Sequence, residues 1–527
     1  MKSLFRYLLL AAATILAAAC GQKKAADDPW AQADRILATM SQVHFPDRSL
    51  SIVDCGAVPG DSTQLATDAI NNAILAMNQA GGGTVIVPSA TFWTGPITLK
   101  SNVNLHLEDG AVLKFSTDVK QYFPAVPSRW EGIDCNNTHP LIYAYGETNI
   151  ALTGKGTIDG CAGNDNWWGR GRFTERRPWP LDPTDPKSRV MEGSRVRLLA
   201  WGEGGAPMYE RTYTEVDGLR PQTIQFNRCT TALIEGVTLL RSPFWVIHPL
   251  MCNDLTVRGV TINNNGPNGD GCDPESCKNV LIEECVFNTG DDCIAIKSGR
   301  NEDGRKWGIP SENIIVRNCT MANGHGGVVI GSEISGGYRN LFVENCKMDS
   351  PNLDRVIRIK TSTARGGVIE GIHVRNVEVG QCREAVLRIN LKYEQNEIAK
   401  RGFIPEVRDV TLENVTCKKS TYGVRFDGLD DQTMINDITL RNCYITCLVY
   451  VDPAFLIPLH RLTQHIYTTI VAVHRQVDKL RLRFPGHTTE FSYFQSNHHV
   501  EQLTTFDEIL VLHQQPFLIL IGIHPHK

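Results

Sequence analysis

The chain has 527 residues, of which 42% are hydrophobic, and a formal net charge of −4 at pH 7. This length is ample for a large core and would by itself suggest more than one domain. The near balance of 53 Lys and Arg against 57 Asp and Glu excludes the overall basic character typical of nucleic-acid-binding proteins. A polyanionic ligand would therefore need a local group of cations.

The N-terminus is predicted to be an export signal. Two basic residues flank the apolar run Leu8–Leu16, and three alanines then precede Cys20. The run is too short for a membrane span but has the form of a secretory signal peptide. Cysteine after small residues is similar to a bacterial lipoprotein site, so residues 1–20 would be a lipoprotein-type signal with Cys20 lipidated. The alternative is an ordinary signal peptide with an incidental cysteine. Residues 21–50 would follow as a tether.

From Ser51 the pattern predicts a strand, a turn and then a helix. Asp61-Ser62-Thr63 is expected to cap this helix and Gly81-Gly82-Gly83 to end it. Its apolar face comprises Ala66, Ile70, Ile74 and Met77. Short strands are expected at 84–87, 97–99 and 103–107. We expect the helix to cover the open end of a stack of strands, whose backbone groups would otherwise stay unpaired.

Periodicity fades between residues 161 and 221, which predicts a long surface insertion. Loops of this length are usually functional or disordered. The segment combines tryptophans such as Trp167, Trp168 and Trp179 with arginines. This composition suits stacking on a sugar, and it suits a packed loop equally well.

After Thr223 a short pattern recurs at irregular intervals. An apolar residue marks each repeat: Leu233, Leu255, Val280, Ile314, Leu341, Ile372, Val410 and Ile438. Most of these residues follow an Asn or Asp. Five residues later comes a small residue, in order Thr238, Val260, Cys285, Cys319, Cys346, Val377, Val415 and Cys443, and Asn often precedes it.

This repeat predicts a parallel β-solenoid. Each coil would add one strand to each of several parallel sheets, so equivalent residues would stack about 4.8 Å apart. The small residues would form an interior ladder, and the Asn residues would hydrogen-bond along the stack at its corners. Four of the sixteen cysteines fall on the interior ladder, which indicates buried small apolar side chains rather than disulfide partners. Leucine-rich repeats share the period, but their Leu-x-x-Leu-x-Leu consensus is missing.

The composition changes after Cys447. Residues 448–527 contain nine histidines, two glycines and no cysteine, and the repeat stops. The tail could be a separate packed element, a helical cap or sequence that is not native, for example after a frameshift. Its histidines are scattered, which argues against a metal site.

The candidate functional residues lie between Asn268 and Lys360. They occur in four short motifs: Asn268-Gly269-Asp270, Gly290-Asp291-Asp292, Gly324-His325-Gly326 and Arg358-Ile359-Lys360. The repeat places Asp291 and His325 at matching positions on consecutive coils. Alternation along a strand directs Arg358 and Lys360 to one face. Each motif alone is typical of a turn or an ordinary strand. On successive coils they predict one acidic cleft with a basic wall.

Such a cleft has the groups needed to hydrolyse a glycosidic bond in an anionic polysaccharide. Hydrolysis needs a proton donor and a base or nucleophile, and two carboxyl groups with separated pKa values supply both. Crowding among Asp270, Asp291 and Asp292 should raise the pKa of one of them. His325 could orient the acid, and the two cations could hold a substrate carboxylate.

The order of these motifs resembles that of family 28 glycoside hydrolases, the polygalacturonases, over roughly Ser51 to Cys447. The resemblance implies an all-β, right-handed parallel β-helix over residues 51–447 that cleaves α-1,4-galacturonan with inversion and without a metal or other cofactor. It also implies the site roles. The general acid would be Asp291, Asp270 and Asp292 would position and activate water, His325 would support the acid, and Asn268, Arg358, Lys360 and Tyr393 would bind substrate. Gly269 stands where polygalacturonases usually have Thr.

Several alternatives remain at this stage. The 161–221 insertion could close one end of the cleft and make the enzyme exo-acting. The substrate could be rhamnogalacturonan or xylogalacturonan. A calcium-dependent pectate lyase and a non-catalytic carbohydrate-binding β-helix share the expected fold. For the polygalacturonase the partner would be a pectic polysaccharide or oligogalacturonide bound by a monomer, without nucleic acid, and membrane association would come only from a lipid at Cys20.

Overall fold

The computed structural model describes residues 28–169, 186–395, 399–429 and 434–447, together with the backbone of five strands between 469 and 522. The chain forms two units, Met1–Thr39 and Met40–Lys527. Helix α2 (Pro29–Thr39) belongs to the first unit, and all that follows concerns the second. The predicted signal peptide, Cys20 and Trp179 lie outside the described residues. Among the helices that are described, none is long and apolar enough to cross a membrane.

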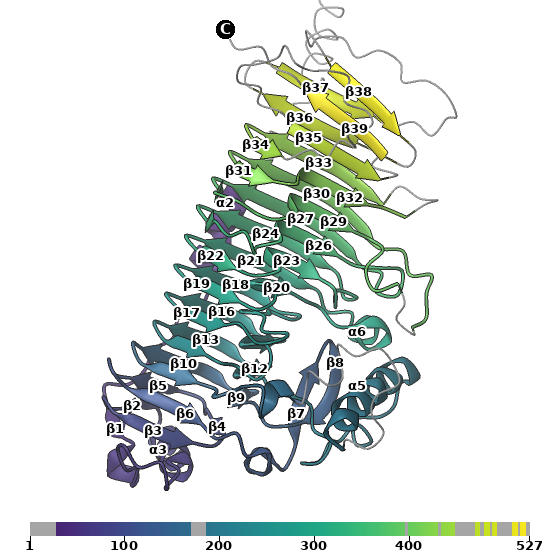
Figure 1. Cartoon of the computed structure of the whole chain (residues 1–527). Helices are drawn as coiled ribbons and strands as arrows, with labels where there is room; N and C mark the ends of the chain where they lie inside the picture. Colours follow the sequence, from purple (N-terminus) through teal and green to yellow (C-terminus); the bar gives the residue numbers. More distant parts are fainter. Residues whose placement is uncertain are drawn as a thin grey trace, which may run out of the picture. The chain divides into compact units, whose positions relative to one another are not determined.

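The second unit is a right-handed parallel β-helix, as predicted, with three long sheets (Figure 1). In spatial order the first sheet consists of β1 (Ser49–Ser51), β2 (Gly83–Val87), β5 (Val103–Leu107), β10 (Thr148–Gly154), β13 (Thr230–Glu235), β16 (Asn253–Arg258), β18 (Lys278–Glu283), β21 (Ser311–Arg317), β24 (Tyr338–Glu344), β27 (Val368–Arg375), β30 (Glu406–Glu413), β33 (Ile435–Arg441), β36 (Lys479–Phe484) and β37 (His487–Ser492). All of its pairings are parallel except that between β36 and β37.

The strands of the second sheet are shorter, and each follows a strand of the first sheet in the chain. It consists of β3 (Thr91–Thr94), β6 (Val112–Phe115), β11 (Thr157–Asp159), β14 (Thr238–Leu240), β17 (Thr261–Asn264), β19 (Val286–Thr289), β22 (Thr320–Asn323), β25 (Lys347–Met348), β28 (Glu378–Val379), β31 (Thr416–Ser420) and β34 (Tyr444–Cys447).

The third sheet carries the candidate site. Its first part consists of β4 (Ile97–Thr98), β9 (Ile142–Tyr145), β12 (Ile224–Asn227) and β15 (Ile247–Leu250), and its second part of β20 (Ile294–Ile296), β23 (Gly326–Gly331), β26 (Arg355–Lys360), β29 (Ala385–Asn390), β32 (Tyr422–Asp427), β35 (Thr469–His474), β39 (Phe517–Gly522) and β38 (Ile509–Gln514). Isolated bridges from Cys272 to Ile247 and to Ile294 join the two parts. Residues 272–275 therefore occupy the place of a strand between β15 and β20.

The register confirms the repeat from Leu255 onward and corrects its first member. Leu255, Val280, Ile314, Leu341, Ile372, Val410 and Ile438 pair in unbroken register. Leu255 pairs with Ala232, however, and not with Leu233. The first small interior residue is accordingly Val237, which is fully buried, and not Thr238. The prediction was one residue late because the turn residue of this coil is Thr231, which has a φ of 56° but is neither Asn nor Asp.

Two ladders of asparagine side chains follow the corners, as expected. At the first, the side-chain amides of Asn279, Asn313 and Asn340 each donate to the residue one coil earlier at 2.9 Å, beginning with Asp254. At the second, Asn376, Asn414 and Asn442 donate in the same way at 3.1 to 3.4 Å. All of these Asn residues have φ near +55°, a conformation that Asn tolerates better than most side chains. The recurring Asn therefore satisfies both the turn and the stack.

The ladder cysteines are buried free thiols. Cys285, Cys319, Cys346 and Cys443 lie in the core cluster between the sheets, as the repeat predicted. The Cys285 thiol donates to the carbonyl of Val257 on the preceding coil at 3.6 Å. These side chains act as small apolar fillers of the interior.

Helix α3 (Thr67–Gln79) covers the N-terminal end of the stack (Figure 1). Its buried residues, which include Ile70, Ile74 and Met77, pack onto β1, β2, β4 and β5. The predicted cap was wrong. The Asp61 carboxylate accepts from the backbone and hydroxyl of Thr63 in a local turn, and the residue at the N-cap position is Ala66, which makes no side-chain cap.

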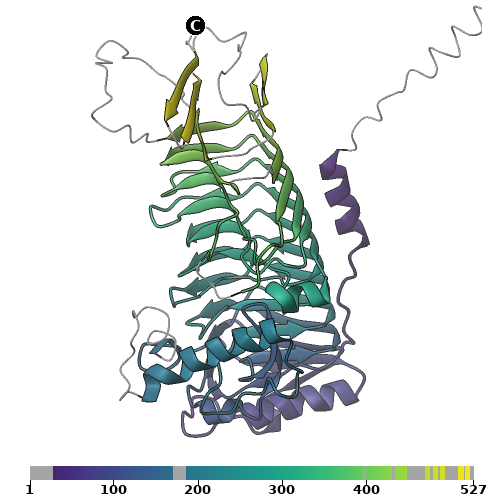
Figure 2. The ribbon, with the colours of Figure 1, turned by 90° about the vertical axis from the view of Figure 1, so that its right-hand side faces the viewer.

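The 161–221 insertion contributes a helix beside the third sheet. Helix α5 (Pro186–Gly204) contacts strand β8 of the hairpin β7 (Val126–Trp130) and β8 (Ile133–Asn137), and it also contacts α6 (Asn301–Trp307) (Figures 1 and 2). These elements enclose a second apolar cluster around Trp130 and Phe244. Trp167 is buried against Tyr122, so it is a packed residue and not a sugar platform.

The described segments of the tail are strands rather than helices. β35 pairs in parallel with β32, and β36 with β33, which adds one more coil to the third and first sheets. The remaining tail strands pair antiparallel. Short 3₁₀ turns at Val53–Cys55 and Val119–Tyr122 complete the described elements.

Candidate active site

The four motifs meet in one pocket of about 450 Å³ on the third sheet. Its walls are formed by Glu131, Trp245, Asn268, Asp270, Asp291, Lys297, Arg300, His325, Ser332, Glu333, Asp354, Arg355, Arg358, Lys360, Arg383, Tyr393 and Glu394. All predicted site residues within the described chain are among them except Asp292, which is fully buried beneath. The predicted juxtaposition of motifs on successive coils is therefore present.

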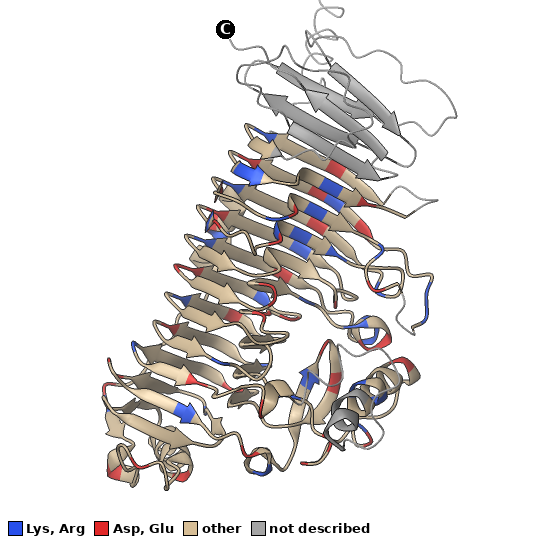
Figure 3. Ribbon diagram, viewed as in Figure 1, with Lys and Arg blue, Asp and Glu red and all other residues tan. Residues whose placement is uncertain are grey.

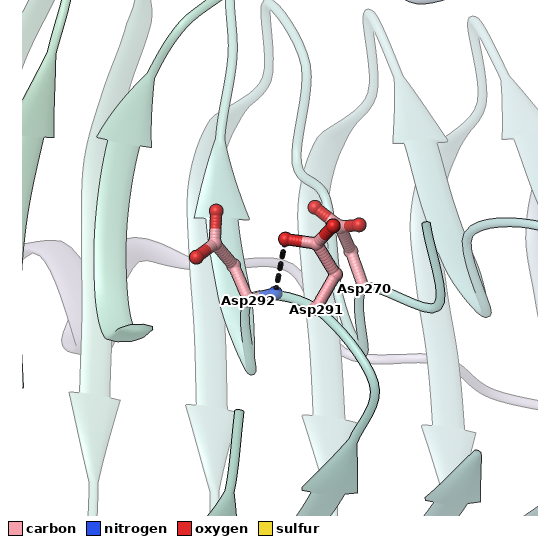
Figure 4. A group of neighbouring side chains, drawn as sticks. All are labelled: Asp270, Asp291 and Asp292. Atoms are coloured by element: carbon pink, nitrogen blue, oxygen red, sulfur yellow. Dashed lines mark hydrogen bonds between the residues drawn. The ribbon is translucent and has the colours of Figure 1, made fainter. Parts of the chain in front are cut away.

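The three aspartates converge from two neighbouring turns (Figure 4). Asp270 ends the turn that leads into residues 272–275, and Asp291 and Asp292 end the turn before β20. One oxygen of each carboxylate lies within 4.8 Å of the others. Asp291 Oδ1 also accepts from the backbone N–H of Asp292 at 2.9 Å, which fixes the orientation of the Asp291 side chain.

Asp292 is held as an ionised carboxylate. The Lys360 ammonium donates to its Oδ2 at 2.7 Å and Arg358 Nη1 donates to its Oδ1 at 3.3 Å. Burial alone would raise the pKa of Asp292, but these two cations hold it well below its usual range. The cations were predicted to bind a substrate carboxylate. They line the pocket as expected, yet in this structure they also neutralise Asp292.

Asp270 is the carboxyl whose pKa is raised. It is only 4% exposed. Burial, and then the negative charge of Asp291, raise the pKa of Asp270 to about 8. The prediction that one crowded carboxyl has a raised pKa is confirmed, but burial is the larger cause. The group affected is Asp270, to which the resemblance gave the water-activating role.

His325 lies beside Asp291 at the mouth of the pocket. Its Nδ1 is 3.1 Å from Asp291 Oδ1, and its backbone N–H donates to the Asp291 carbonyl at 3.0 Å. The hydrogen bond to Asp291 raises the pKa of His325. The two flanking glycines are required by space. A Cβ on Gly324 would lie 2.7 Å from the Asp291 carbonyl oxygen, and one on Gly326 would lie 3.0 Å from Asp292 Oδ1.

The two remaining predicted residues are also placed by neighbours. The Tyr393 ring lies 5.5 Å from the Arg358 guanidinium and 5.3 Å from the Lys360 ammonium, within cation–π range. The side-chain oxygen Oδ1 of Asn268 accepts from Arg220 Nη2 at 2.8 Å.

Sequence reasoning missed Lys297, a buried cation at the centre of the pocket floor. Its ammonium is 3.1 Å from Glu333, 3.7 Å from Asp273 and 3.9 Å from Asp270, and it lies over the Trp245 ring. The available signal was a lysine ending the apolar strand Ile294–Ile296 directly after Asp291-Asp292-Cys293. A charged residue continuing a buried strand needs a charged partner.

A continuous series of ion pairs links this floor to the insertion. Glu333 contacts Arg300 at 3.0 Å, Arg300 contacts Glu131 at 3.1 Å, and Glu131 contacts Arg195 of α5 at 2.8 Å. Glu131, Arg300 and Glu333 line the pocket, and Arg195 contacts Glu131. We call these four residues the charged wall (Glu131, Arg195, Arg300 and Glu333). These four residues lie far apart in the sequence, so no short motif indicated them.

Cations continue along the third sheet on the other side of the pocket. Arg358, Arg388 and Arg425 pair in register on β26, β29 and β32. Acidic residues alternate with them (Figure 3): Arg388 and Arg425 both contact Glu384, and Arg388 also contacts Asp427. Basic groups therefore flank the pocket on the coils that follow it.

The three aspartates are also the group within the described residues whose spacing could accommodate a metal ion. Protein cations already balance this charge, because Asp292 pairs with Lys360 and Arg358 while Lys297 lies near Asp270. A divalent ion, which favours several carboxylate oxygens, would have to compete with them.

A parallel β-helix with grouped carboxylates and cations in a pocket on one sheet has the architecture of a polysaccharide-cleaving glycosidase. The family described as glycosyl hydrolases family 28 matches residues 202–449. A crystal structure described as a hyperthermoactive exopolygalacturonase from Thermotoga maritima is 35% identical and covers 87% of this chain and 97% of its own, with a TM-score of 0.75. The chain belongs to glycosyl hydrolase family 28.

Other relatives include enzymes named for exo and for endo action. The exo-poly-alpha-D-galacturonosidase of Dickeya chrysanthemi is 30% identical over 71% of this chain and 62% of its own length. The endo-polygalacturonase of Pectobacterium carotovorum is 27% identical over 74% of this chain and 87% of its own.

Proposed function

We propose that this enzyme hydrolyses α-1,4-linked galacturonan with inversion, and that the pocket on the third sheet is its active site. The observation that carries the proposal is the meeting of Asp270, Asp291 and Asp292 within 4.8 Å, bordered by Arg358 and Lys360. Carboxyl groups serve the bond cleavage, and the cations suit a uronate carboxylate. The names of the relatives support the same substrate.

In the proposed mechanism Asp291 donates a proton to the glycosidic oxygen. Asp270 and Asp292 hold a water on the opposite side of the sugar ring, and Asp270 accepts its proton as the water attacks. His325, hydrogen-bonded to Asp291, orients the acid. Arg358, Lys360, Tyr393 and Asn268 hold the sugar ring and its carboxylate.

The two carboxyl groups of inverting glycosidases usually lie about 6.5–9.5 Å apart, and the carboxylates here are closer. Both Asp292 oxygens are engaged by cations and Asp270 is only 4% exposed, so neither carboxylate is well placed to attack the sugar. Attack by water is therefore favoured over a covalent intermediate. Proton NMR of the first-formed product tests this: a β-anomer supports inversion, and an α-anomer contradicts it.

The charged wall favours removal of sugars from a chain end. Glu131, Arg300 and Glu333 line the pocket, and Arg195 of α5 contacts Glu131 behind them. A polymer could leave the pocket on the side of β29 and β32, along Arg388 and Arg425. Product sizing on polygalacturonate decides the mode: only monomer or dimer indicates exo action, whereas a ladder of oligomers indicates endo action.

Product analysis and binding measurements separate the alternative functions. A pectate lyase would give an unsaturated, ultraviolet-absorbing product and lose activity with a chelator. A binding protein would release no reducing ends, and its affinity would not depend on Asp291. For a hydrolase, Asp291→Asn should abolish turnover while binding to oligogalacturonide persists. Activity confined to branched pectins would point to rhamnogalacturonan or xylogalacturonan.

We also propose that the protein is exported and anchored by a lipid at Cys20, as a monomer. The support is the charged and apolar pattern of residues 1–20. Cys20→Ser should move the protein from the membrane fraction to the soluble one, and unchanged membrane association would contradict the anchor. Size-exclusion chromatography with light scattering tests whether the protein is a monomer.

A further inference from the structure

Asp273 is a buried carboxyl group that the mechanism above does not use. It lies three residues after Asp270, in the strand-like segment that joins β15 to β20. Its backbone N–H donates to Ile247 at 2.8 Å, which fixes its place in the sheet. The side chain is 0% exposed, and neither carboxyl oxygen has a hydrogen-bond donor among the described residues.

The Asp273 side chain contacts another carboxyl group. It makes a hydrogen-bonding contact with Asp270, and Lys297 is 3.7 Å from Asp273 Oδ1. Two ionised carboxylates are acceptors only, so such a contact is stabilising only when one of them carries a proton. The geometry thus requires a proton in this pair.

Lys297 does not supply enough charge to ionise both groups. Its ammonium lies closer to Glu333, at 3.1 Å, than to Asp273 or to Asp270. The charged groups that act on the pair are Asp291 and Asp292 before β20, Lys297 after it and Lys360 on β26. Glu333, after β23, contacts Lys297. Lys360 is already engaged by Asp292. An unpaired buried carboxylate is costly, and Asp273 is the more enclosed member.

We propose that Asp273 carries this proton in the working enzyme and donates a hydrogen bond to Asp270, which keeps Asp270 ionised and oriented as the base. Asp273 is then a positioning residue that acts through Asp270. The inference rests on the proposed function for the role of Asp270. Burial and the adjacent Asp270 raise the pKa of Asp273 well above its usual range.

The variants Asp273→Asn and Asp273→Ala test this arrangement. An amide has the shape of a neutral carboxylic acid and keeps a donor toward Asp270, whereas alanine removes it. A hydrogen bond to a charged group contributes roughly 1.5–3 kcal/mol, so its loss should raise the Asp270 pKa by about one to two units. Asp254→Asn is a matched control, because Asp254 is also largely buried but belongs to the distant asparagine ladder.

The readout is the acidic limb of kcat/KM against pH on polygalacturonate, which reports ionisation of the base. We expect this limb to move to higher pH in Asp273→Ala and much less in Asp273→Asn. If Asp273 were ionised, removing its charge would move the limb to lower pH in both variants. That result, or no movement in either, would overturn the proposal.

Infrared spectroscopy gives a readout that does not depend on activity or on the alanine variant folding. At a pH above 8, where Asp270 is ionised, the wild-type protein should show a protonated carboxylic acid band that Asp273→Asn lacks and Asp254→Asn keeps. An unchanged band in Asp273→Asn would show that Asp273 carries no proton. If polygalacturonate is not cleaved at all, the proposed function fails while the infrared test of the proton still stands.

Discussion

At the scale of single residues, the site depends on how Asp292 is neutralised. It is completely buried, and its two oxygens face Lys360 and Arg358. Removing one partner of a buried ion pair leaves an uncompensated charge and commonly costs about 3–5 kcal/mol. Asp292 therefore combines a structural role with its proposed part in activating water.

Asp292→Asn should lose activity and stability together. We expect kcat to fall by about 10²- to 10⁴-fold, the range for general acid–base groups, and the free energy of unfolding to fall because Lys360 loses its partner. Kinetics and chemical denaturation measure the two effects. Asp159→Asn, which removes a buried partner of Arg241 outside the pocket, should affect stability alone. Equal loss of activity in both variants would contradict the assignment.

Asp270→Asn should stabilise the protein while abolishing turnover. The folded-state pKa of Asp270 is raised to about 8, so the folded protein binds more protons than the unfolded chain between about pH 4 and pH 8. Stability conferred by this group therefore declines as pH rises through that window, and the amide avoids the decline. The gain in melting temperature should be larger at pH 8 than at pH 4. A gain independent of pH would show that ionisation of Asp270 is not its cause.

Residue identities in the site could be read from short motifs, but their electrostatic roles could not. Asp270, Asp291, His325 and Arg358 were predicted because the repeat fixes which turns are neighbours. Lys297 was missed because a single lysine carries no local signal. Which carboxyl has the raised pKa depends on burial, which the sequence does not specify.

At the scale of elements, the asparagine ladders hold the coils in register. Asn313 donates to Asn279 and accepts from Asn340, both at 2.9 Å, and has a φ of 59°. Asn313→Ala should lower the free energy of unfolding by roughly 1–3 kcal/mol, through lost hydrogen bonds and backbone strain. Asn313→Gly relieves the strain and should be less destabilising. Equal effects in denaturant titrations would mean that the backbone conformation contributes nothing.

The element least visible in the sequence was the insertion and its contact with the pocket. We predict that Arg195→Gln, which removes the ion pair with Glu131, loosens the charged wall and lengthens the released products. Arg197→Gln is the control, because Arg197 lies on the same helix but pairs with Asp217. Chromatography of early products measures the change, and identical profiles for both variants would exclude a role for the wall in product length.

Strand positions were predicted well because inward residues alternate and turn residues recur. The prediction failed where one of these signals was absent. Thr231 takes the place of Asn or Asp and shifted the first repeat by one residue. The sequence predicted Asp61 as a helix cap, but its carboxylate instead accepts a hydrogen bond from Thr63 in a local turn. A local hydrogen bond decides the outcome at Asp61, and the pairing of neighbouring coils decides it at Thr231.

At the scale of the whole β-helical unit, helix α3 has to cover the first coil. Ile70, Ala73 and Ile74 of α3 are fully buried in the end of the core. Ile70→Asp should detach the helix and expose both apolar core and strand edge, which favours association between molecules. Light scattering after size-exclusion chromatography should detect oligomers, whereas Leu75→Asp on the exposed face of the same helix should remain monomeric. Monomeric Ile70→Asp would contradict the capping role.

Within the three sheets each coil pairs only with the coils before and after it, and this has a consequence for how such an enzyme can vary. The catalytic groups come from adjacent turns, so an added coil between β20 and β23 would part Asp291 from His325. Coils gained or lost beyond β32, by contrast, would change how many sugar units the protein binds and would not change bond cleavage. Substrate length and chemistry can therefore diverge independently in this architecture.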